Sequence, residues 1–292
     1  MASPPSRRIP ERLRSSWSRD PALLAWLNRL PAAVDELARQ WELIVDAPFD
    51  HEDVNCSWVA RARRSDGTRA VLKVGMPHME GEHEIQALRF WNGDPTVRLL
   101  EADEELGAML LERCEPGTSL RALPEPEQDI VLASLLRRLW RTPSHPHPFR
   151  HLSAMLREWR AETLAQSAQW PDAGLVTEGL RVLEELARPA EHDVLLATDL
   201  RGGNVLRAAR EPWLVIDPKP FIGDPAYDAT QHLKLSEERM LSSPHETIRR
   251  FAGLLEVDAE RVRMWVFGRA AAEPRAEWDA RWRELARVLA TG

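Results

Sequence analysis

The chain has 292 residues and a formal net charge of −7 at pH 7, and 43% of its residues are hydrophobic and 29% charged. These values are typical of a globular protein whose core is large enough for one or two domains. No apolar run is long enough to span a membrane, and the negative charge argues against nucleic acid as a partner while it is compatible with a cationic one.

The N-terminal residues 1–20 carry five arginines, and no apolar segment follows them that would make a signal peptide. We interpret this stretch as a disordered basic leader. The two cysteines, Cys56 and Cys114, predict neither a disulfide framework nor a metal site. This cysteine usage indicates a reducing compartment, and we expect a cytoplasmic protein.

Residues 23–44 carry apolar side chains at alternating steps of four and three, which is the pattern of an amphipathic helix. Pro31 lies inside this pattern, and we expect it to kink the helix or to begin a second one. The following region is typical of strands. Residues 57–63 alternate, 65–67 form a turn and 70–74 are apolar, which predicts a β-hairpin.

Lys73 lies within the apolar strand predicted over Ala70–Val74. A lysine in such a strand must be paired, or must extend its ammonium group outward. The segment matches the strand lysine of kinases, Val-Ala-Ile-Lys. A kinase would place its phosphate-covering loop at residues 51–57, where this chain has no glycine. We therefore expect phosphate contacts that differ from those of a glycine-rich loop.

An acidic partner for Lys73 is expected on the helix predicted over residues 80–92. Glu84 lies on the same face as the apolar residues Leu88 and Trp91, which follow it at i+4 and i+7. Glu80 lies one turn earlier and is the alternative. We predict that Glu84 pairs with Lys73.

Two further strands are predicted over residues 97–102 and 109–113, after which Pro and Gly within residues 112–117 break the pattern. We expect the hinge between two lobes at this point. Residues 124–189, and the chain after residue 228, carry mainly the apolar spacing of helices. Trp278 and Trp282 belong to the apolar face of the last predicted helix, and we expect them to serve packing rather than ligand binding.

The most informative stretch is residues 194–228. Short apolar runs lead to Asp199 and Asp217, and Asn204 lies between these two acids. Runs this short, bounded by Gly, Pro and charged residues, favour buried strands over helices. An acid just after a buried strand is costly unless it is paired, and magnesium prefers oxygen ligands. The stretch therefore predicts a magnesium and phosphate site.

The segment Asp199-Leu-Arg-Gly-Gly-Asn204 has the Asp-x-x-x-x-Asn spacing of a kinase catalytic loop, and Asp217 follows where kinases place a metal-binding aspartate. The stretch resembles the aminoglycoside phosphotransferase family, whose usual form is close to His-Gly-Asp-Leu-His-x-x-Asn followed by Ile-Asp. The downstream Glu-Pro-Trp-Leu-Val-Ile-Asp-Pro-Lys and Gly-Asp-Pro-Ala-Tyr-Asp resemble the branch that holds streptomycin 6-phosphotransferases and hydroxyurea phosphotransferases.

The sequence departs from this family pattern at the catalytic loop. The family's histidine two residues before the catalytic aspartate is Ala197 here, and its second histidine is Arg201. In kinases the first histidine mainly hydrogen-bonds backbone groups, so its absence concerns how the loop is held rather than the chemistry. Gly202 and Gly203 allow the loop to turn tightly. Asp224 is expected to brace this loop from the following helix.

The resemblance implies an α+β, two-lobed protein-kinase-like fold, with a small antiparallel sheet in the N-terminal lobe and a mostly helical C-terminal lobe. We expect a nucleotide-binding lobe over residues 21–113 and a catalytic and substrate-binding lobe over residues 114–292. The resemblance also implies the use of ATP or GTP with Mg²⁺, a small-molecule hydroxyl acceptor, and a monomer or a dimer.

For the site, the resemblance implies separate duties. Lys73, held by Glu84, would bind the α and β phosphates, and Asn204 and Asp217 would hold magnesium. Asp199 would deprotonate the acceptor hydroxyl. The residues expected to bind the nucleotide and its metal, including the segment that meets adenine through its backbone, are Lys73, Glu84, Leu111, Glu112, Cys114, Asn204 and Asp217.

The acceptor is expected to contact Asp199, Arg201 and Asp228. A carboxylate such as Asp228 suits a polycationic sugar antibiotic. Three functions remain open: an ATP-dependent phosphotransferase for a streptomycin-like aminoglycoside that gives resistance, a kinase for hydroxyurea or another small metabolite, and a nucleotide-binding pseudokinase. The intact lysine, catalytic loop and metal-binding aspartate argue against the third.

Overall fold

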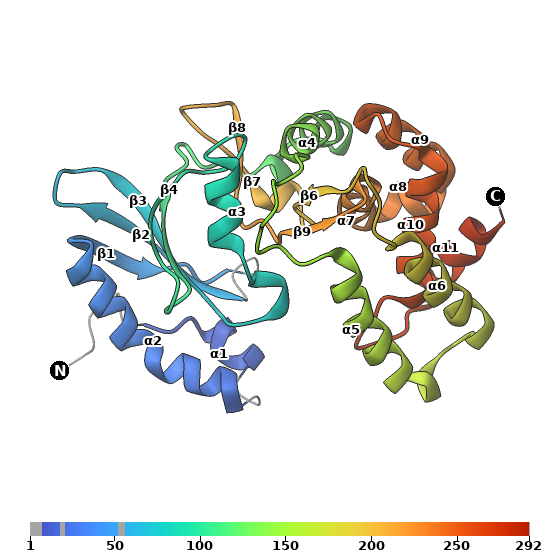
Figure 1. Cartoon of the computed structure of the whole chain (residues 1–292), viewed down its shortest axis with the longest axis horizontal. Coiled ribbons are helices and arrows are strands. Elements are labelled where there is room, and N and C mark those ends of the chain that lie inside the picture. Colours follow the sequence, from blue (N-terminus) through green and yellow to red (C-terminus); the bar gives the residue numbers. More distant parts are fainter. Residues whose placement is uncertain (1–7, 18–20, 52–55, 292) are drawn as a thin grey trace. The chain divides into compact units, whose positions relative to one another are not determined.

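The computed structural model describes residues 8–17, 21–51 and 56–291, and the chain forms two compact units (Figure 1). Unit 1 comprises Met1–Thr118 together with Leu206–Ile216, and unit 2 comprises Ser119–Val205 together with Asp217–Gly292. The division thus follows residue 118, a few positions after the predicted boundary. Within the described ranges, no helix has the length and apolar character needed to cross a membrane.

Unit 1 begins with two helices, α1 (Glu11–Trp17) and α2 (Pro21–Gln40). The predicted apolar stripe lies on α2, where Leu30 and Leu37 are almost completely buried. The helix continues through Pro31, so no second helix begins there.

The prediction of a disordered leader over residues 1–20 is wrong for α1. This segment is helical, and Leu13 is fully buried in the same hydrophobic cluster as residues of α2. Burial of this side chain stabilises the short helix against the core of unit 1. Residues 1–7 and 18–20 of the predicted leader lie outside the described residues.

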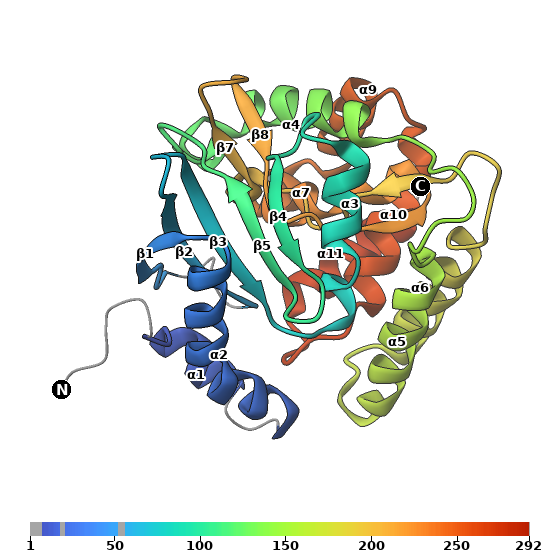
Figure 2. The same ribbon diagram turned by 60° about the vertical axis from the view of Figure 1, so that its left-hand side comes forward.

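The core of unit 1 is a five-stranded antiparallel sheet in the order β1-β2-β3-β5-β4, which Figure 2 shows from left to right. The predicted hairpin is present as β2 and β3. The strands are β1 (Leu43–Pro48), β2 (Ser57–Arg64), β3 (Arg69–Gly75), β4 (Leu99–Asp103) and β5 (Ala108–Glu112).

The two faces of this sheet are covered by different helices. Leu72 and Leu110 belong to the cluster that includes α2, whereas Met109 and Leu111 belong to the cluster that includes α3 (Glu84–Trp91). Successive strand residues point to opposite faces, and residues directly opposite on paired strands share a face. Lys73 lies opposite Met109 and therefore points toward the α3 side.

A second hairpin, formed by β7 (Val205–Arg207) and β8 (Trp213–Val215), belongs mainly to unit 1 although the prediction assigned it to the C-terminal lobe. Leu214 is fully buried with the apolar residues of α3, and Val97 N donates a hydrogen bond to Val215 O at 3.0 Å. These contacts explain the difference, because apolar burial and backbone pairing outweigh sequence proximity.

Unit 2 is mostly helical. Its helices are α4 (Glu125–Leu139), α5 (Leu152–Ala165), α6 (Ala173–Leu186), α7 (Ala229–Leu235), α8 (Glu237–Ser242), α9 (Pro244–Leu255), α10 (Ala259–Ala272) and α11 (Ala280–Ala290). Helix α10 is buried along most of its length and packs closely on α6. A Cβ added to Gly179 of α6 would lie 2.6 Å from that of Ala271, so the absence of a side chain permits this close approach.

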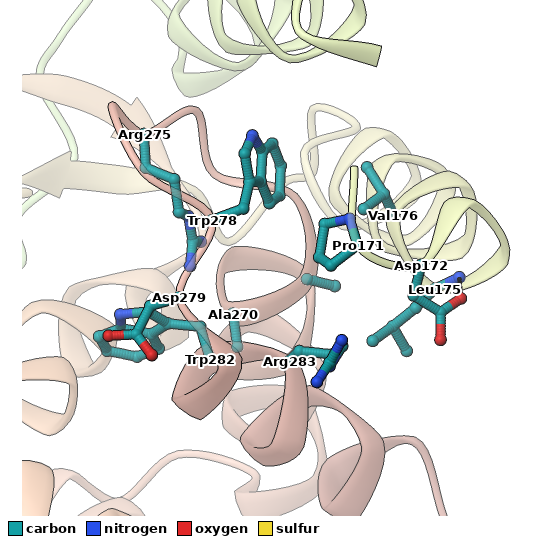
Figure 3. Close-up of a pocket in the computed structure, with 11 residues that line it drawn as sticks. Pro171, Asp172, Leu175, Val176, Ala270, Arg275, Trp278, Asp279, Trp282 and Arg283 are labelled. Atoms are coloured by element: carbon teal, nitrogen blue, oxygen red, sulfur yellow. Dashed lines mark hydrogen bonds between the residues drawn. The ribbon is translucent and has the colours of Figure 1, made fainter. Parts of the chain in front are cut away.

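The segment between α10 and α11 packs through aromatic and arginine side chains. Arg275 lies over the rings of Trp278 and Trp282 at 5.3 and 5.5 Å from their centroids. Figure 3 shows these side chains lining a small pocket with Val176 of α6 and with Pro171, which precedes that helix. Trp278 precedes α11 rather than belonging to it, because the helix begins only at residue 280.

Candidate active site

Unit 1 contains the predicted phosphate-binding lysine, and Lys73 and Glu84 form a buried ion pair there. Lys73 Nζ lies 2.5 and 2.6 Å from the two carboxylate oxygens of Glu84, and the residues are only 5% and 4% exposed. Glu84 begins α3, where the helix dipole favours a negative charge. The predicted pair is confirmed, and it fixes an ammonium group in the way that kinases hold their phosphate-binding lysine.

The predicted adenine-binding segment ends β5 and continues into the following loop. The carboxylate of Glu112 accepts hydrogen bonds from Arg210 at 2.9 and 3.0 Å and from Arg98 N at 3.0 Å, so its side chain stabilises unit 1. Burial raises the pKa of the Cys114 thiol to about 12, which keeps it protonated at neutral pH. The adenine contact of Leu111, Glu112 and Cys114 through their backbone stays a prediction, and residues 52–55 of the predicted phosphate-covering segment lie outside the described residues.

Unit 2 contains the predicted catalytic residue, Asp199. Strand β6 (Val194–Leu196), paired with β9 (Phe221–Gly223), leads into the loop that carries this residue. Asn204 Nδ2 donates to Asp199 Oδ2 at 3.1 Å and to its carbonyl oxygen at 2.9 Å, while Gln231 Nε2 donates to Asp199 Oδ1 at 2.7 Å. Both carboxylate oxygens are therefore held by amide donors. The Asp199 side chain remains 26% exposed, so a small molecule can reach it.

The electrostatic surroundings of Asp199 raise its pKa above the ordinary aspartate value. Burial is the main cause, and the nearby charge of Asp217 acts in the same direction, whereas Arg201, Lys219 and the hydrogen bond from Asn204 lower it. Arg201 Nε lies 3.7 Å from Asp199 Oδ1. A raised pKa makes the carboxylate a better proton acceptor while it is ionised.

Asp217 is paired with Lys219, for which the sequence predicts no role. Lys219 Nζ donates to Asp217 Oδ1 at 2.7 Å, and Lys219 is buried. The backbone of Asp217 has a φ of +53°, which is uncommon for a residue with a side chain and concentrates at functional sites. The only sequence signal for Lys219 was its place two residues after Asp217 in the Asp-Pro-Lys motif.

Asn204 and Asp217 have the donor chemistry that magnesium requires. Because a carboxylate only accepts hydrogen bonds, the amide nitrogen of Asn204 must face Asp199, and its oxygen forms the other end of the side chain. The Asp217 carboxylate is 32% exposed. Among the described residues, no group of three or more His, Cys, Asp or Glu could hold a metal. Two oxygen ligands nevertheless fit magnesium, which takes its remaining ligands from water and phosphate.

The prediction that Asp228 contacts the acceptor is wrong. Asp228 is 1% exposed, and its carboxylate accepts hydrogen bonds from Ala197 N at 3.1 Å, Thr198 N at 2.8 Å and Trp140 Nε1 at 3.0 Å. Burial raises the pKa of Asp228 to about 6, although these donors act in the opposite direction. Asp228 thus holds the backbone just before Asp199, which compensates for the missing family histidine.

Thr198 links the catalytic loop to the segment that carries Asp217. Its hydroxyl donates to Lys219 O at 2.7 Å, and Lys219 N donates to Ala197 O at 2.9 Å. These bonds tie together the two loops whose acids are candidates for catalysis and metal binding.

Asp224 does not contact the catalytic loop in the way that the sequence predicted. Its carboxylate accepts hydrogen bonds from Ala226 N at 3.0 Å and from Arg261 Nε and Trp265 Nε1, both at 2.5 Å. The donors Arg261 and Trp265 belong to α10, so Asp224 anchors the short turn before α7 to that central helix. The bracing expected of Asp224 is performed by Asp228.

Both glycines of the catalytic loop have close neighbours, and at Gly202 these include backbone atoms. A Cβ on Gly202 would lie 2.5 Å from Gln128 Oε1 and 3.2 Å from Arg121 N, and a Cβ on Gly203 would lie 2.6 Å from an Arg121 guanidinium nitrogen. The sequence predicts that these glycines allow a tight turn. In the structure Gly202 is explained by its close approach to the backbone of Arg121, whereas the neighbours of Gly203 are side-chain ends that can move.

These features define the chain as a phosphotransferase with a protein-kinase-like fold. The structure resembles a choline kinase from Streptococcus pneumoniae, with a TM-score of 0.58 and 14% identity over 89% of this chain and 98% of the other. It also resembles a macrolide 2′-phosphotransferase type I, with a TM-score of 0.53 and 15% identity over 82% and 88% of the two chains. The predicted fold class is confirmed.

The family follows from the sequence. The model of the aminoglycoside/hydroxyurea antibiotic resistance kinases matches residues 41–281, and the chain belongs to this family of kinases. It is 37% identical to a streptomycin 6-kinase from Streptomyces glaucescens, covering 93% of this chain and 90% of that protein. It is 36% identical to a hydroxyurea phosphotransferase from Kitasatospora aureofaciens, covering 84% and 72%. The family predicted from the catalytic stretch is confirmed.

Proposed function

We propose that the protein transfers the γ-phosphate of ATP to a hydroxyl group of a streptomycin-like aminoglycoside, with Mg²⁺, and thereby gives resistance to it. The observation that carries this proposal is the carboxylate of Asp199, held by two amide donors and still partly exposed. Similarity to streptomycin 6-kinases supports the choice of acceptor, since the chain covers 90% of each of two such proteins but 72% of the hydroxyurea enzyme. Use of ATP fits a cytoplasmic enzyme.

Phosphoryl transfer needs accurate positioning and neutralisation of charge more than covalent help from the protein. Lys73, fixed by Glu84, binds the α and β phosphates. Asn204 and Asp217 would hold magnesium, which would neutralise charge on the phosphate oxygens. Asp199 orients the acceptor hydroxyl and accepts its proton.

Asp199 can still accept this proton although both of its carboxylate oxygens already accept hydrogen bonds. An ionised carboxylate offers about four lone-pair sites. The donors from Asn204 and Gln231 occupy one site on each oxygen and hold the plane of the carboxylate. Arg201 favours the ionised form, which a base must have before it can accept a proton.

The acceptor can be tested directly with purified protein and magnesium-ATP. Streptomycin, hydroxyurea and a neutral sugar are offered separately, and the products are identified by mass spectrometry. We expect one phosphate group on streptomycin and the highest kcat/KM for this acceptor, with Asp199→Asn as the inactive control. Turnover of hydroxyurea without turnover of streptomycin would overturn the proposal and favour the alternative acceptor. Nucleotide binding without transfer to any acceptor would indicate a pseudokinase.

A further inference from the structure

Gln231 is a conspicuous neighbour of Asp199 that the family resemblance did not point to. It lies on α7, thirty-two positions after Asp199, and its Nε2 donates to Asp199 Oδ1 at 2.7 Å. Asn204 holds the opposite oxygen, so the carboxylate is fixed from two sides. Asn204 is also a candidate metal ligand, whereas Gln231 is not. The contact of Gln231 with Asp199 is therefore independent of magnesium.

A glutamine amide can hold a carboxylate only in one of its two orientations. If the amide were turned over, its oxygen would face Asp199 and repel it. Arg269 NH2 donates to Gln231 Oε1 at 3.1 Å, and a guanidinium group has donors only. This contact fixes the amide so that its NH2 group faces Asp199.

Arg269 is itself held firmly inside unit 2. It is 6% exposed, it donates to both oxygens of Glu273 at 3.0 and 3.2 Å, and its NH1 donates to Thr230 Oγ1 at 2.6 Å. Its guanidinium group also lies over the rings of Trp159 and Tyr227, 5.3 and 5.4 Å from their centroids. A side chain with this many partners has one orientation, and its hydrogen bond therefore fixes the orientation of the Gln231 amide.

Glu273, the acidic partner of Arg269, is held as firmly as Arg269 itself. Glu273 also accepts a hydrogen bond from Lys234 Nζ at 2.9 Å. Burial alone would raise the pKa of Glu273, but Arg269 and Lys234 outweigh it and lower the pKa to about 2. Glu273 is therefore ionised at every pH at which the protein is expected to act, and the support of Arg269 does not change with pH.

We infer that Gln231 is a positioning residue for phosphoryl transfer, and that Arg269, supported by Glu273, sets its amide orientation. This inference rests on the proposed role of Asp199 as the base. Gln231 fixes the carboxylate toward the acceptor through a charge-assisted hydrogen bond. It does not touch the transferred group.

The test uses two substitutions of Gln231 that differ in size and charge. Gln231→Leu removes the donor, and we expect kcat for streptomycin to fall about 10- to 100-fold with the KM for ATP unchanged. Gln231→Glu keeps the size and the contact with Arg269 but places a second carboxylate against Asp199. We expect a larger loss of kcat than for Leu, with the KM for ATP again unchanged.

The order of the two variants separates positioning from packing. If Gln231 served only to fill space, the isosteric Glu would be milder than Leu, and that order would overturn the inference. Gln169→Glu, at an exposed position of unit 2, makes the same charge change and is expected to behave as wild type. Equal activity of all variants and wild type would also overturn the inference.

The role of Arg269 is tested by coupling. Arg269→Lys keeps the charge but cannot reach Thr230, Gln231 and Glu273 together. We expect it to lower kcat, and we expect the double variant with Gln231→Leu to be no slower than Gln231→Leu alone. Additive losses would show that Arg269 acts independently of Gln231.

A measurement without acceptor keeps this inference separate from the proposed function. The orientation of the Asp199 carboxylate can be compared in crystal structures of wild type and of both Gln231 variants. We expect the carboxylate to keep the orientation set by Gln231 in wild type and to turn away from it in Gln231→Leu and in Gln231→Glu. If wild type phosphorylates no acceptor, the proposed function fails, while an unchanged orientation of the carboxylate in both variants would refute the positioning role by itself.

Discussion

The buried ion pair in unit 1 gives a prediction that separates stability from nucleotide binding. Glu84→Ala removes the carboxylate that lies 2.5 and 2.6 Å from Lys73 Nζ, and leaves the ammonium at a position that is only 5% exposed. Breaking a buried pair at one partner costs about 3–5 kcal/mol, because a charge stays buried without its counterion. Since domains are stable by only about 5–15 kcal/mol, this is a large fraction of the total.

Removing both charges should have a different outcome. The double variant Lys73→Met/Glu84→Leu replaces the pair with apolar side chains of similar size beside Met109 and the apolar residues of α3. Such replacements are often neutral or stabilising, so we expect a free energy of unfolding within about 1 kcal/mol of wild type or above it. Magnesium-ATP binding should nevertheless be lost, because the phosphate-binding ammonium is gone.

Unfolding of unit 1 can be followed in urea by hydrogen exchange of peptides from β3 and α3, and nucleotide binding by calorimetry. Arg89→Ala, which breaks the exposed pair of Arg89 with Glu104, is the matched control and should cost less than about 1 kcal/mol. A Glu84→Ala protein as stable as wild type would refute the argument about the buried charge. A double variant that still binds magnesium-ATP as tightly as wild type would refute the nucleotide role of Lys73.

Further predictions concern the loop around Asp199. Arg201→Ala removes a charge that lowers the pKa of Asp199, so the pKa rises and the acidic limb of kcat/KM against pH should move to higher pH; an unmoved limb would contradict the assignment of Asp199 as the base. Asp228→Asn places an NH2 group against the backbone donors of Ala197 and Thr198 and should lower kcat without changing the KM for streptomycin. If steady-state kinetics showed mainly a raised KM, Asp228 would contact the acceptor after all. Thr198→Val removes the hydrogen bond to Lys219 O and should lower the free energy of unfolding, measured by urea titration, by about 1 kcal/mol. An unchanged free energy of unfolding would contradict a stabilising role of this bond.

The parts of the site that were predicted from sequence depend on short-range spacing. Asp199 and Asn204 lie five positions apart on one loop, and Glu84 was selected over Glu80 because helix periodicity places it with the buried residues Leu88 and Trp91. In both cases the geometry follows from local structure, which a single sequence specifies well.

The parts that could not be predicted depend on the meeting of distant elements. Gln231 lies on α7 and Arg269 on α10. The residues next to them in the sequence do not indicate that Gln231 contacts Asp199 or that Arg269 orients Gln231. The exchange of duties between Asp224 and Asp228 has a similar cause. Asp224 caps a short 3₁₀ turn and Asp228 ends it, and the path of this turn decides which of the two acids reaches the catalytic loop.

The helix α1 was missed for a related reason. Its charged composition suggested disorder, but one residue, Leu13, is fully buried with the apolar face of α2. Helix formation in so short a segment comes from tertiary packing rather than from its own propensity.

Single-turnover transfer by Asp199→Asn tests the central claim most directly. Radiolabelled γ-phosphate of ATP is followed onto streptomycin by rapid quench in wild type and in the variant, and magnesium-ATP binding is measured in parallel by calorimetry. The account predicts that transfer slows by about 10²–10⁴-fold, the usual worth of a catalytic base, while the nucleotide affinity is unchanged. Transfer at the wild-type rate by Asp199→Asn would contradict the account, because the proton of the acceptor hydroxyl would then go elsewhere.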